Sequence, residues 1–326
     1  MALFDKFGRQ ITDLRISVTD RCNFRCVYCR SADPENHMEW RQLLTWDELE
    51  RLARILVGLG IRKVRVTGGE PLVREGIEDF IARLDALGVQ DLSITTNGHL
   101  LAERCDRLVR AGLDRINISL DSLDAEKFER VTRTRSFSKV MAGIDAAQGS
   151  RLRPVKVNAV LVRGLNDDEV ENFVEFARER DLIMRFIEFM PLDADRHWSH
   201  DAVVPAAEVK RRVEACHKLV PVPHERSETA RKYRFADGRG EIGLVASVTE
   251  PFCGFCSRIR LTADGKLRTC LFSKDDHDLK FLLRNGAGDA EVAQFIQSVV
   301  MEKEEGHRIN EPDFVPPSRT MVFIGG

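Results

Sequence analysis

Three cysteines stand close together near the start of the chain, in the segment TDRCNFRCVYCR (residues 19–30). Cys22, Cys26 and Cys29 follow the spacing C-x3-C-x2-C. A structural zinc site normally takes four protein ligands, often from two C-x2-C pairs or with added histidines. The nearest histidine, His37, lies beyond the stretch SADPEN, so this group is one ligand short. A cubane iron–sulfur cluster fits the shortage, because three thiolates can hold three irons and leave the fourth to an outside ligand.

A second group of three cysteines stands in PFCGFCSRIRLTADGKLRTCLF (residues 251–272), with the spacing C-x2-C-x13-C. A strand, an ADGK turn and a return strand predict a hairpin that brings Cys253, Cys256 and Cys270 together. One interpretation is a zinc site that recruits His277 or His217 as its fourth ligand. The other is a second iron–sulfur cluster with one open iron, which would explain why each group has three cysteines instead of four ligands.

Basic residues accompany these cysteines. Arg258 and Arg260 stand two apart on the predicted hairpin, so they share a face, and paired guanidinium groups suit phosphate. Buried cations without partners are costly, so a polyanionic substrate would explain them. In the alternative interpretation they pair with carboxylates such as Asp121 and Glu188. Further cations lie on the polar faces of predicted strands: Arg15, Lys63, Arg65 and Lys156.

Strands and helices are expected to alternate along the first two thirds of the chain. The first helix is expected to begin after Thr45, which forms a capping box with Glu48, and to end at Gly60; the second stops at Gly88. Such repeated units imply a parallel sheet, either doubly wound or curled into a barrel. The strand candidates are residues 14–18, 63–67, 92–96, 115–120, 155–162 and 184–189.

The alternation within these strands favours the barrel. Strand after strand has one apolar and one polar face, whereas a parallel strand covered on both sides should be almost entirely apolar. The sequence therefore predicts an incomplete (β/α)6 TIM-like barrel over residues 1–216, whose interior is a ligand chamber. Residues 217–326 are expected to form a C-terminal cap that carries the cysteine hairpin. Cys22, Cys26 and Cys29 then fall at the carboxyl rim, where active sites of such folds lie.

Composition excludes several other classes of protein. The 326 residues include 50 basic and 52 acidic side chains, a net charge of −2, without blocks of like charge. No nucleic-acid or anionic-membrane partner is therefore expected. The absence of an apolar leader and of long apolar runs predicts a cytoplasmic protein, whose thiols stay reduced. The remaining cysteines, Cys105 and Cys216, are expected to be buried in helices.

The first cysteine group, with Tyr28 just before its last member, resembles the C-x3-C-x-aromatic-C signature of radical S-adenosylmethionine enzymes. The resemblance implies that the open iron chelates the amino and carboxylate groups of S-adenosylmethionine. One electron then yields methionine and a 5′-deoxyadenosyl radical that takes hydrogen from the substrate. The segment TGGEP (residues 67–71) is similar to the family's GGE segment, whose exposed backbone and carboxylate receive the amino group. The family pattern assigns the cofactor to Tyr28, Gly68, Gly69, Glu70, Thr95, Ser119, Lys156, Arg185 and Met190.

Nearly the whole chain is similar to the radical enzymes that begin molybdenum cofactor biosynthesis. Segments that carry this resemblance are DLRISVTDRCNFRCVYC, RVTGGEPLVR, INISLDSL, RFIEFMP, CGFCSRIRLTADGKL and the terminal Gly325-Gly326. It implies two [4Fe–4S] clusters, GTP as substrate, ring closure between the ribose C3′ and guanine C8, an external electron donor and a homodimer. It also implies that the Gly-Gly tail reaches the active site. The residues expected to act on the substrate are Arg15, Arg258 and Arg260, with Lys63 and Arg65 as further substrate contacts.

Two alternatives stay open from the sequence. One is another two-cluster radical enzyme that acts on a peptide. Such an enzyme would need a groove for the peptide instead of a cationic chamber. The other is a non-catalytic zinc or iron–sulfur protein.

Overall fold

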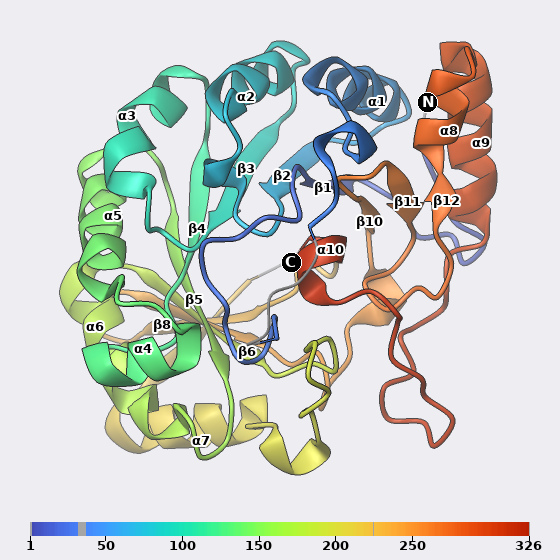
Figure 1. Cartoon of the computed structure of the whole chain (residues 1–326). Helices are drawn as coiled ribbons and strands as arrows, with labels where there is room; N and C mark the ends of the chain where they lie inside the picture. Colours follow the sequence, from blue (N-terminus) through green and yellow to red (C-terminus); the bar gives the residue numbers. More distant parts are fainter. Residues whose placement is uncertain (1, 32–36, 224, 326) are drawn as a thin grey trace.

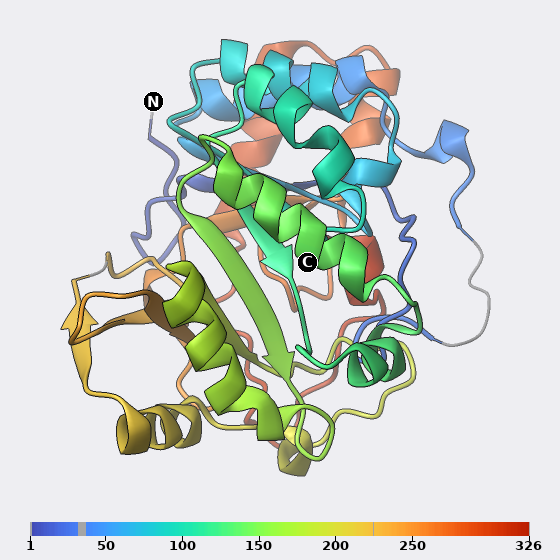
Figure 2. The same cartoon turned by 90° about the vertical axis from the view of Figure 1, so that its left-hand side faces the viewer.

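The computed structural model describes residues 2–31, 37–223 and 225–325. Its strands form one sheet in the order β12-β11-β10-β1-β2-β3-β4-β5-β6-β9-β8-β7. All neighbours from β10 through β1 to β6 and on to β9 are parallel, whereas the outer pairs are antiparallel. The sheet curves, with helices on its outside, as in an incomplete TIM-like barrel (Figures 1 and 2).

The six predicted strands and the helices between them are confirmed. Thr45 caps the first helix: its hydroxyl accepts from the Glu48 N–H at 3.2 Å, and the Glu48 carboxylate accepts from the Thr45 N–H at 2.8 Å. The strands are β1 Asp13–Ser17, β2 Lys63–Thr67, β3 Asp91–Thr96, β4 Arg115–Ser119, β5 Val155–Leu161 and β6 Ile183–Glu188. The helices are α1 Trp46–Gly58, α2 Ile77–Ala86, α3 Leu101–Arg110, α4 Ala125–Thr132, α5 Phe137–Gly149, α6 Val170–Arg180 and α7 Ala206–Cys216.

The rest of the chain extends both edges of this sheet. Strands β7 Leu219–Val222, β8 Arg231–Phe235 and β9 Glu241–Val245 add to β6, and β10 Arg258–Leu261, β11 Lys266–Arg268 and β12 His277–Asp278 add to β1. Helices α8 Leu279–Arg284, α9 Asp289–Met301 and α10 Met321–Ile324 follow. Residues beyond 216 therefore share one sheet with the barrel instead of only covering it. The division into two domains at this point stays a prediction.

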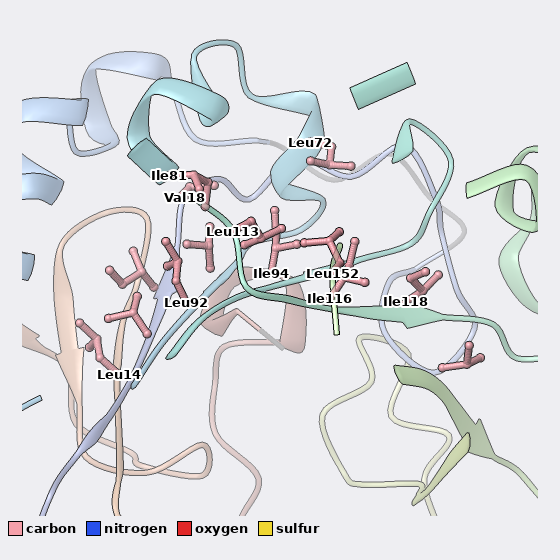
Figure 3. Close-up of a cluster of buried hydrophobic side chains, with 14 of the residues drawn as sticks. Leu14, Val18, Leu72, Ile81, Leu92, Ile94, Leu113, Ile116, Ile118 and Leu152 are labelled. Carbon is pink, nitrogen blue, oxygen red and sulfur yellow. The ribbon is translucent and has the colours of Figure 1, made fainter. Parts of the chain in front are cut away.

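The apolar faces of the strands meet the helices in a continuous core. Leu14, Ile94 and Ile116 are at most 1% exposed, and Figure 3 shows such side chains clustered with Leu113 and Leu152 from the loops that precede β4 and β5. Burial on this side leaves the alternate, polar residues to the interior, as the strand pattern predicted. Among the described residues, no helix has the length and apolar character needed to cross a membrane.

The two isolated cysteines differ. Cys105, inside α3, is buried as predicted, whereas Cys216 is exposed, so its predicted burial was wrong. Cys216 is the last residue of α7, after the buried positions Ala206, Val209 and Val213 of that helix.

Candidate active site

One cavity of about 300 Å³ lies at the carboxyl ends of the barrel strands. Cys22, Cys26 and Cys29 reach it from the loop after β1, and we call them the first trio. Cys253 and Cys256 come from the turn before β10 and Cys270 from the loop after β11, and we call these the second trio. All six cysteines line this one cavity, and none of them is in a disulfide. The fold thus brings together two groups that lie more than two hundred residues apart.

The paired glycines after β2 let the chain approach the loop of the first trio. A Cβ atom on Gly68 would lie 2.8 Å from the carbonyl oxygen of Thr19, and one on Gly69 would lie 2.4 Å from that of Arg21. The N–H of Gly69 donates to the Thr19 oxygen at 2.6 Å, and that of Glu70 donates to the Arg21 oxygen at 2.8 Å. Only residues without side chains allow this pairing, so the segment fixes the cysteine loop in addition to making a turn.

The carboxylate of Glu70 is buried, and the residue lines the cavity with the cysteines. It accepts hydrogen bonds from the Leu72 N–H (3.0 Å), the Thr96 hydroxyl (2.8 Å) and the Asn97 N–H (2.7 Å). Burial raises its pKa to about 7, and these hydrogen bonds oppose the rise. The side chain therefore joins the β2 and β3 loops, and Asn97 in turn lies 3.9 Å from the sulfur of Cys22.

Two acidic residues that were alternative partners for the cations are used elsewhere. Asp121 accepts from the Tyr28 hydroxyl at 2.6 Å and from the Val160 N–H at 2.9 Å. Burial raises the pKa of Asp121 to about 6. Glu188 accepts from main-chain N–H groups of the following loops, among them that of Val248 at 2.7 Å. Neither carboxylate pairs with a cation of the chamber.

A second cavity of about 220 Å³ lies at the amino ends of the strands and carries the predicted cations. Lys63 pairs with Glu225 at 3.1 Å. Within the described part of the chain, no carboxylate forms an ion pair with Arg15, Arg65, Lys156 or Arg185. Burial, followed by repulsion from neighbouring cations, lowers the pKa of each of these four groups. The residues shared by the two cavities include Arg15, Arg65, Arg185 and Arg258.

The second trio lies beside cations. The hairpin of β10 and β11 is antiparallel as predicted, and Arg258 donates to the sulfur of Cys256 at 3.3 Å. Burial raises the pKa of Cys256, but the charges of Arg258 and Lys303 outweigh it and bring the pKa to about 6. A thiolate is therefore favoured at this position.

The histidines proposed to complete a zinc site lie elsewhere. His217 contacts Glu175 at 2.5 Å, and His277 lies 3.9 Å from Glu302. The histidine that lines the cavity is His307, whose Nδ1 accepts from the Ile309 N–H at 3.2 Å. In the parts of the chain that the structure describes, no three His, Cys, Asp or Glu residues are grouped as ligands of one metal ion.

The C-terminal tail enters the cavity from the side of β1 and β2, and Figure 1 shows α10 in the middle of the molecule. Gly325 has φ of +87°, and a Cβ atom there would lie 2.7 Å from both the Ser17 Cβ and the Thr67 hydroxyl. Arg260 donates to the Gly325 carbonyl at 2.5 Å. Glycine is therefore required by both conformation and space. The other predicted tail residue, Gly326, lies outside the described residues.

All the predicted site residues that remain also line these cavities. Tyr28, Thr95, Ser119 and Met190 line the cavity with the cysteines, and Lys156 lines the cationic one. The sequence did not single out Asn97 or His307, which line the same space. Asn97 directly follows β3, a position that could have flagged it, whereas His307 stands in an irregular segment without a recognisable pattern.

Comparisons with known proteins agree with this arrangement. Residues 16–177 match the family model described as Radical SAM superfamily, and residues 182–309 match Molybdenum Cofactor Synthesis C. A protein of Rhodopirellula baltica named GTP 3′,8-cyclase is 46% identical over 100% of this chain and 92% of its own length. Proteins of the same name from Mycolicibacterium smegmatis and Paenarthrobacter nicotinovorans are 46% and 42% identical, over 99% and 100% of this chain and 92% and 97% of their lengths.

Solved structures support the fold alone. Streptococcus suis SuiB bound to S-adenosylmethionine has a TM-score of 0.61 at 14% identity, over 98% of this chain and 79% of that chain. Another SuiB crystal structure has a TM-score of 0.62 at 14% identity, over 97% and 77% of the two chains. With the matching family models and the full-length relatives, the chain belongs to the GTP 3′,8-cyclase family of the radical S-adenosylmethionine superfamily.

Proposed function

We propose that this chain converts GTP to (8S)-3′,8-cyclo-7,8-dihydroguanosine 5′-triphosphate, the first step of molybdenum cofactor biosynthesis. The observation that carries the proposal is the placement of two cysteine trios on one cavity, beside a second cavity where Arg15, Arg65, Lys156 and Arg185 form no ion pair with a carboxylate of the described residues. Relatives that are 42–46% identical over nearly their full length are named for GTP, which favours a nucleotide over a peptide substrate.

Membership of the radical S-adenosylmethionine superfamily implies S-adenosylmethionine and one [4Fe–4S] cluster. The first trio fits this cluster, because its three cysteines come from one short loop and line the cavity. When bound, the cluster and S-adenosylmethionine supply the 5′-deoxyadenosyl radical that removes the ribose 3′ hydrogen. Five further residues line the same cavity and would hold S-adenosylmethionine. They are Gly68 and Gly69 after β2, Thr95 of β3, Ser119 of β4 and Met190 after β6.

The cations of the second cavity are assigned to the triphosphate, including Lys156 and Arg185, which the family resemblance assigned to the cofactor. Lys63, Arg65 and Lys156 line the cavity at the amino ends of the strands, and the Nε of Arg185 is buried without a hydrogen-bond partner among the described residues. Phosphate oxygens would supply the missing partners and relieve the repulsion between these groups. A triphosphate held there directs the ribose and the guanine toward the two trios.

The remaining substrate contacts are assigned to Arg15, Arg258 and Arg260. Arg15 and Arg258 line both cavities, so each can reach a nucleotide that spans them. Arg260 is fixed by the carbonyl of Gly325, which packs the tail against the same space. Fixing the ribose against the base lets C3′ bond to C8 faster than the substrate radical is quenched.

A second [4Fe–4S] cluster is part of this proposal: Cys253, Cys256 and Cys270 would hold it, and it would supply an iron without a protein ligand to the guanine. Arg258 and Lys303 favour the thiolate form of Cys256, which a metal ligand requires. An external electron donor, a homodimer and a cytoplasmic location complete the proposal by family resemblance.

The test is an anaerobic incubation of the reconstituted protein with S-adenosylmethionine, dithionite and either GTP or ATP. We expect 5′-deoxyadenosine and a cyclised nucleotide with GTP, and neither above background in the Cys26→Ser variant. Equal turnover of GTP and ATP, or no 5′-deoxyadenosine from the unmodified protein, would contradict the proposal.

A further inference from the structure

The segment after α9, residues 303–307, lies against the second trio and makes contacts that the proposed reaction does not use. Lys303 is 1% exposed, and its amine donates to the carbonyl of Arg258 at 3.0 Å and to that of Thr269. Arg258 stands two residues after Cys256, and Thr269 stands immediately before Cys270. One buried amine therefore ties together the two arms of the hairpin at the positions that carry these thiols.

The neighbouring residues complete the contact with the trio. The carboxylate of Glu304 accepts from the hydroxyls of Thr269 (2.7 Å) and Ser273 (2.5 Å), which flank Cys270. The backbone of Gly306 lies against Cys253, because a Cβ atom built on Gly306 would lie 3.5 Å from the Cβ and 3.8 Å from the sulfur of Cys253. Residues 303–307 thus touch the chain next to all three cysteines.

Arg9 fastens this segment to the first arm of the hairpin. Its guanidinium donates to the carbonyls of Cys253 (2.8 Å), Glu305 (2.8 Å) and Glu304 (2.6 Å). Asp5 holds Arg9 in place through an ion pair of 2.6 Å. The N-terminal segment, the 303–307 segment and the cysteine hairpin therefore form one hydrogen-bonded unit.

The charge of Lys303 has no carboxylate partner in the described part of the chain. A buried ammonium without a counter-charge is costly, so a nearby negative group is needed to offset it. The amine of Lys303 is held between the two arms that carry the second trio, so a cluster bound there would supply the matching negative charge.

We propose that Lys303 is the positioning and charge-compensating residue of the second trio's iron–sulfur cluster, supported by the rest of the 303–307 segment. This inference rests on the second cluster of the proposed function. Hydrogen-bonding groups around metal ligands fix ligand geometry, and nearby charge adjusts cluster potential. Loss of Lys303 should therefore affect the second cluster and leave the first one unchanged.

The experiment uses full-length protein in two backgrounds. In one, Cys22, Cys26 and Cys29 are replaced by serine, so that only the second trio can hold a cluster; in the other, Cys253, Cys256 and Cys270 are replaced. Each background receives Lys303→Met or the control Lys280→Met, whose parent amine donates to the Gln42 carbonyl on an exposed part of the surface. Iron loss to a chelator and the reduction potential are measured after anaerobic reconstitution.

In the background that keeps the second trio, Lys303→Met should speed iron loss about 10- to 100-fold. It should also make the cluster's potential more negative, because a nearby positive charge is lost. The first cluster and both Lys280→Met proteins should behave as their parents do. If the Lys303→Met chain fails to fold, Glu304→Gln is used to test the inference. This variant should also speed iron loss at the second trio alone, but by a smaller factor.

Three results distinguish failure of the inference from failure of the proposal on which it rests. A normal second cluster in both the parent and Lys303→Met, with unchanged retention and potential, overturns the inference alone. Equal damage to the two clusters also overturns it, since that result indicates general destabilisation. No cluster on the second trio of the parent overturns the second cluster of the proposed function and this inference with it.

Discussion

The two cysteine trios share one cavity, but Cys22 of the first and Cys256 of the second lie in opposite electrostatic surroundings. At the first trio, burial and the nearby Glu70 raise the pKa of Cys22 to about 11. At the second trio, Arg258 and Lys303 bring the pKa of Cys256 to about 6 despite burial. Negative surroundings make a cluster harder to reduce and positive ones make it easier. With the second cluster proposed above, the difference would make the first cluster the more strongly reducing of the two.

The largest expected effect comes from removing one ligand at each trio. Cys26→Ser should abolish 5′-deoxyadenosine formation, because the first trio serves the cleavage of S-adenosylmethionine. Cys256→Ser should abolish the cyclised product but retain slow, uncoupled formation of 5′-deoxyadenosine. Chromatographic quantification of both products checks this, and identical loss of 5′-deoxyadenosine in the two variants would remove the functional distinction between the trios.

The thiols of the metal-free protein should differ in reactivity. At pH 7 Cys256 is mostly thiolate and Cys22 mostly thiol, since their pKa values are about 6 and about 11. The thiolate fraction is about 10⁴-fold larger at Cys256 than at Cys22. The thiolate of Cys22 is more basic and therefore about 10²-fold more nucleophilic, so Cys256 should react about 100-fold faster overall. Timed alkylation followed by mass spectrometry measures the ratio. Equal rates would show that the two electrostatic surroundings do not differ as described.

The tail should matter to the product and much less to the stability of the fold. Gly325→Ala adds a Cβ atom 2.7 Å from Ser17 and Thr67 at a φ of +87°, so the tail should leave its place. We expect the rate of GTP cyclisation to fall about 10- to 100-fold, since displacing a group next to the substrate by about 1 Å can cost that much. The matched control is Gly288→Ala, where an added Cβ meets nothing within 4 Å. A normal rate in Gly325→Ala would exclude a role for the docked tail.

Lys156 should show the smallest effect, with opposite signs for stability and for binding. Burial and the charges of Arg185, Arg115 and Arg65 lower its pKa to about 7. Between pH 7 and pH 10.5 the unfolded chain binds a proton at this site and the folded chain does not, so the free energy of unfolding rises with pH across this range. Below pH 7 the charged, buried amine destabilises the fold. At pH 6, where the buried amine is charged, Lys156→Met should raise the melting temperature of the metal-free protein.

The same substitution should weaken GTP binding, because a phosphate that pairs with Lys156 needs the protonated amine. We expect KM for GTP to rise about 10-fold in Lys156→Met, the value of one hydrogen bond to a charged group. In the unmodified protein KM should rise as the pH passes through about 7. Melting curves and steady-state kinetics across pH 6–9 check both signs, and an unchanged KM in Lys156→Met would remove this residue from the phosphate site.

The sequence predicted the local features of the barrel well. Period-two alternation located β1 to β6, and the cap of Thr45 located α1, because these signals depend on residues close together in the chain. The cysteine spacings likewise identified both trios. The pairing of β9 with β6 and of β10 with β1 was not predicted, because the sequence of a short strand does not indicate which distant strand it pairs with.

Long-range contacts also explain which features of the site the sequence did not predict. The buried hydrogen bonds of Glu70 join it to the β3 loop, and those of Arg9 and Lys303 join segments about 250 and about 40 residues apart. No local pattern reports such contacts. The Gly-Gly pair after β2 was visible as a motif, but its close approach to Thr19 and Arg21 required the fold.

The most direct test of the account is the iron content of three anaerobically reconstituted proteins: the unmodified chain and the two triple-serine variants. Two cubane clusters require about eight irons per chain in the first and about four in each variant. Mössbauer spectra of the same samples should show one cubane in each variant. Bound zinc in place of iron at either trio, or a variant that keeps the full iron content of the unmodified chain, would contradict the account.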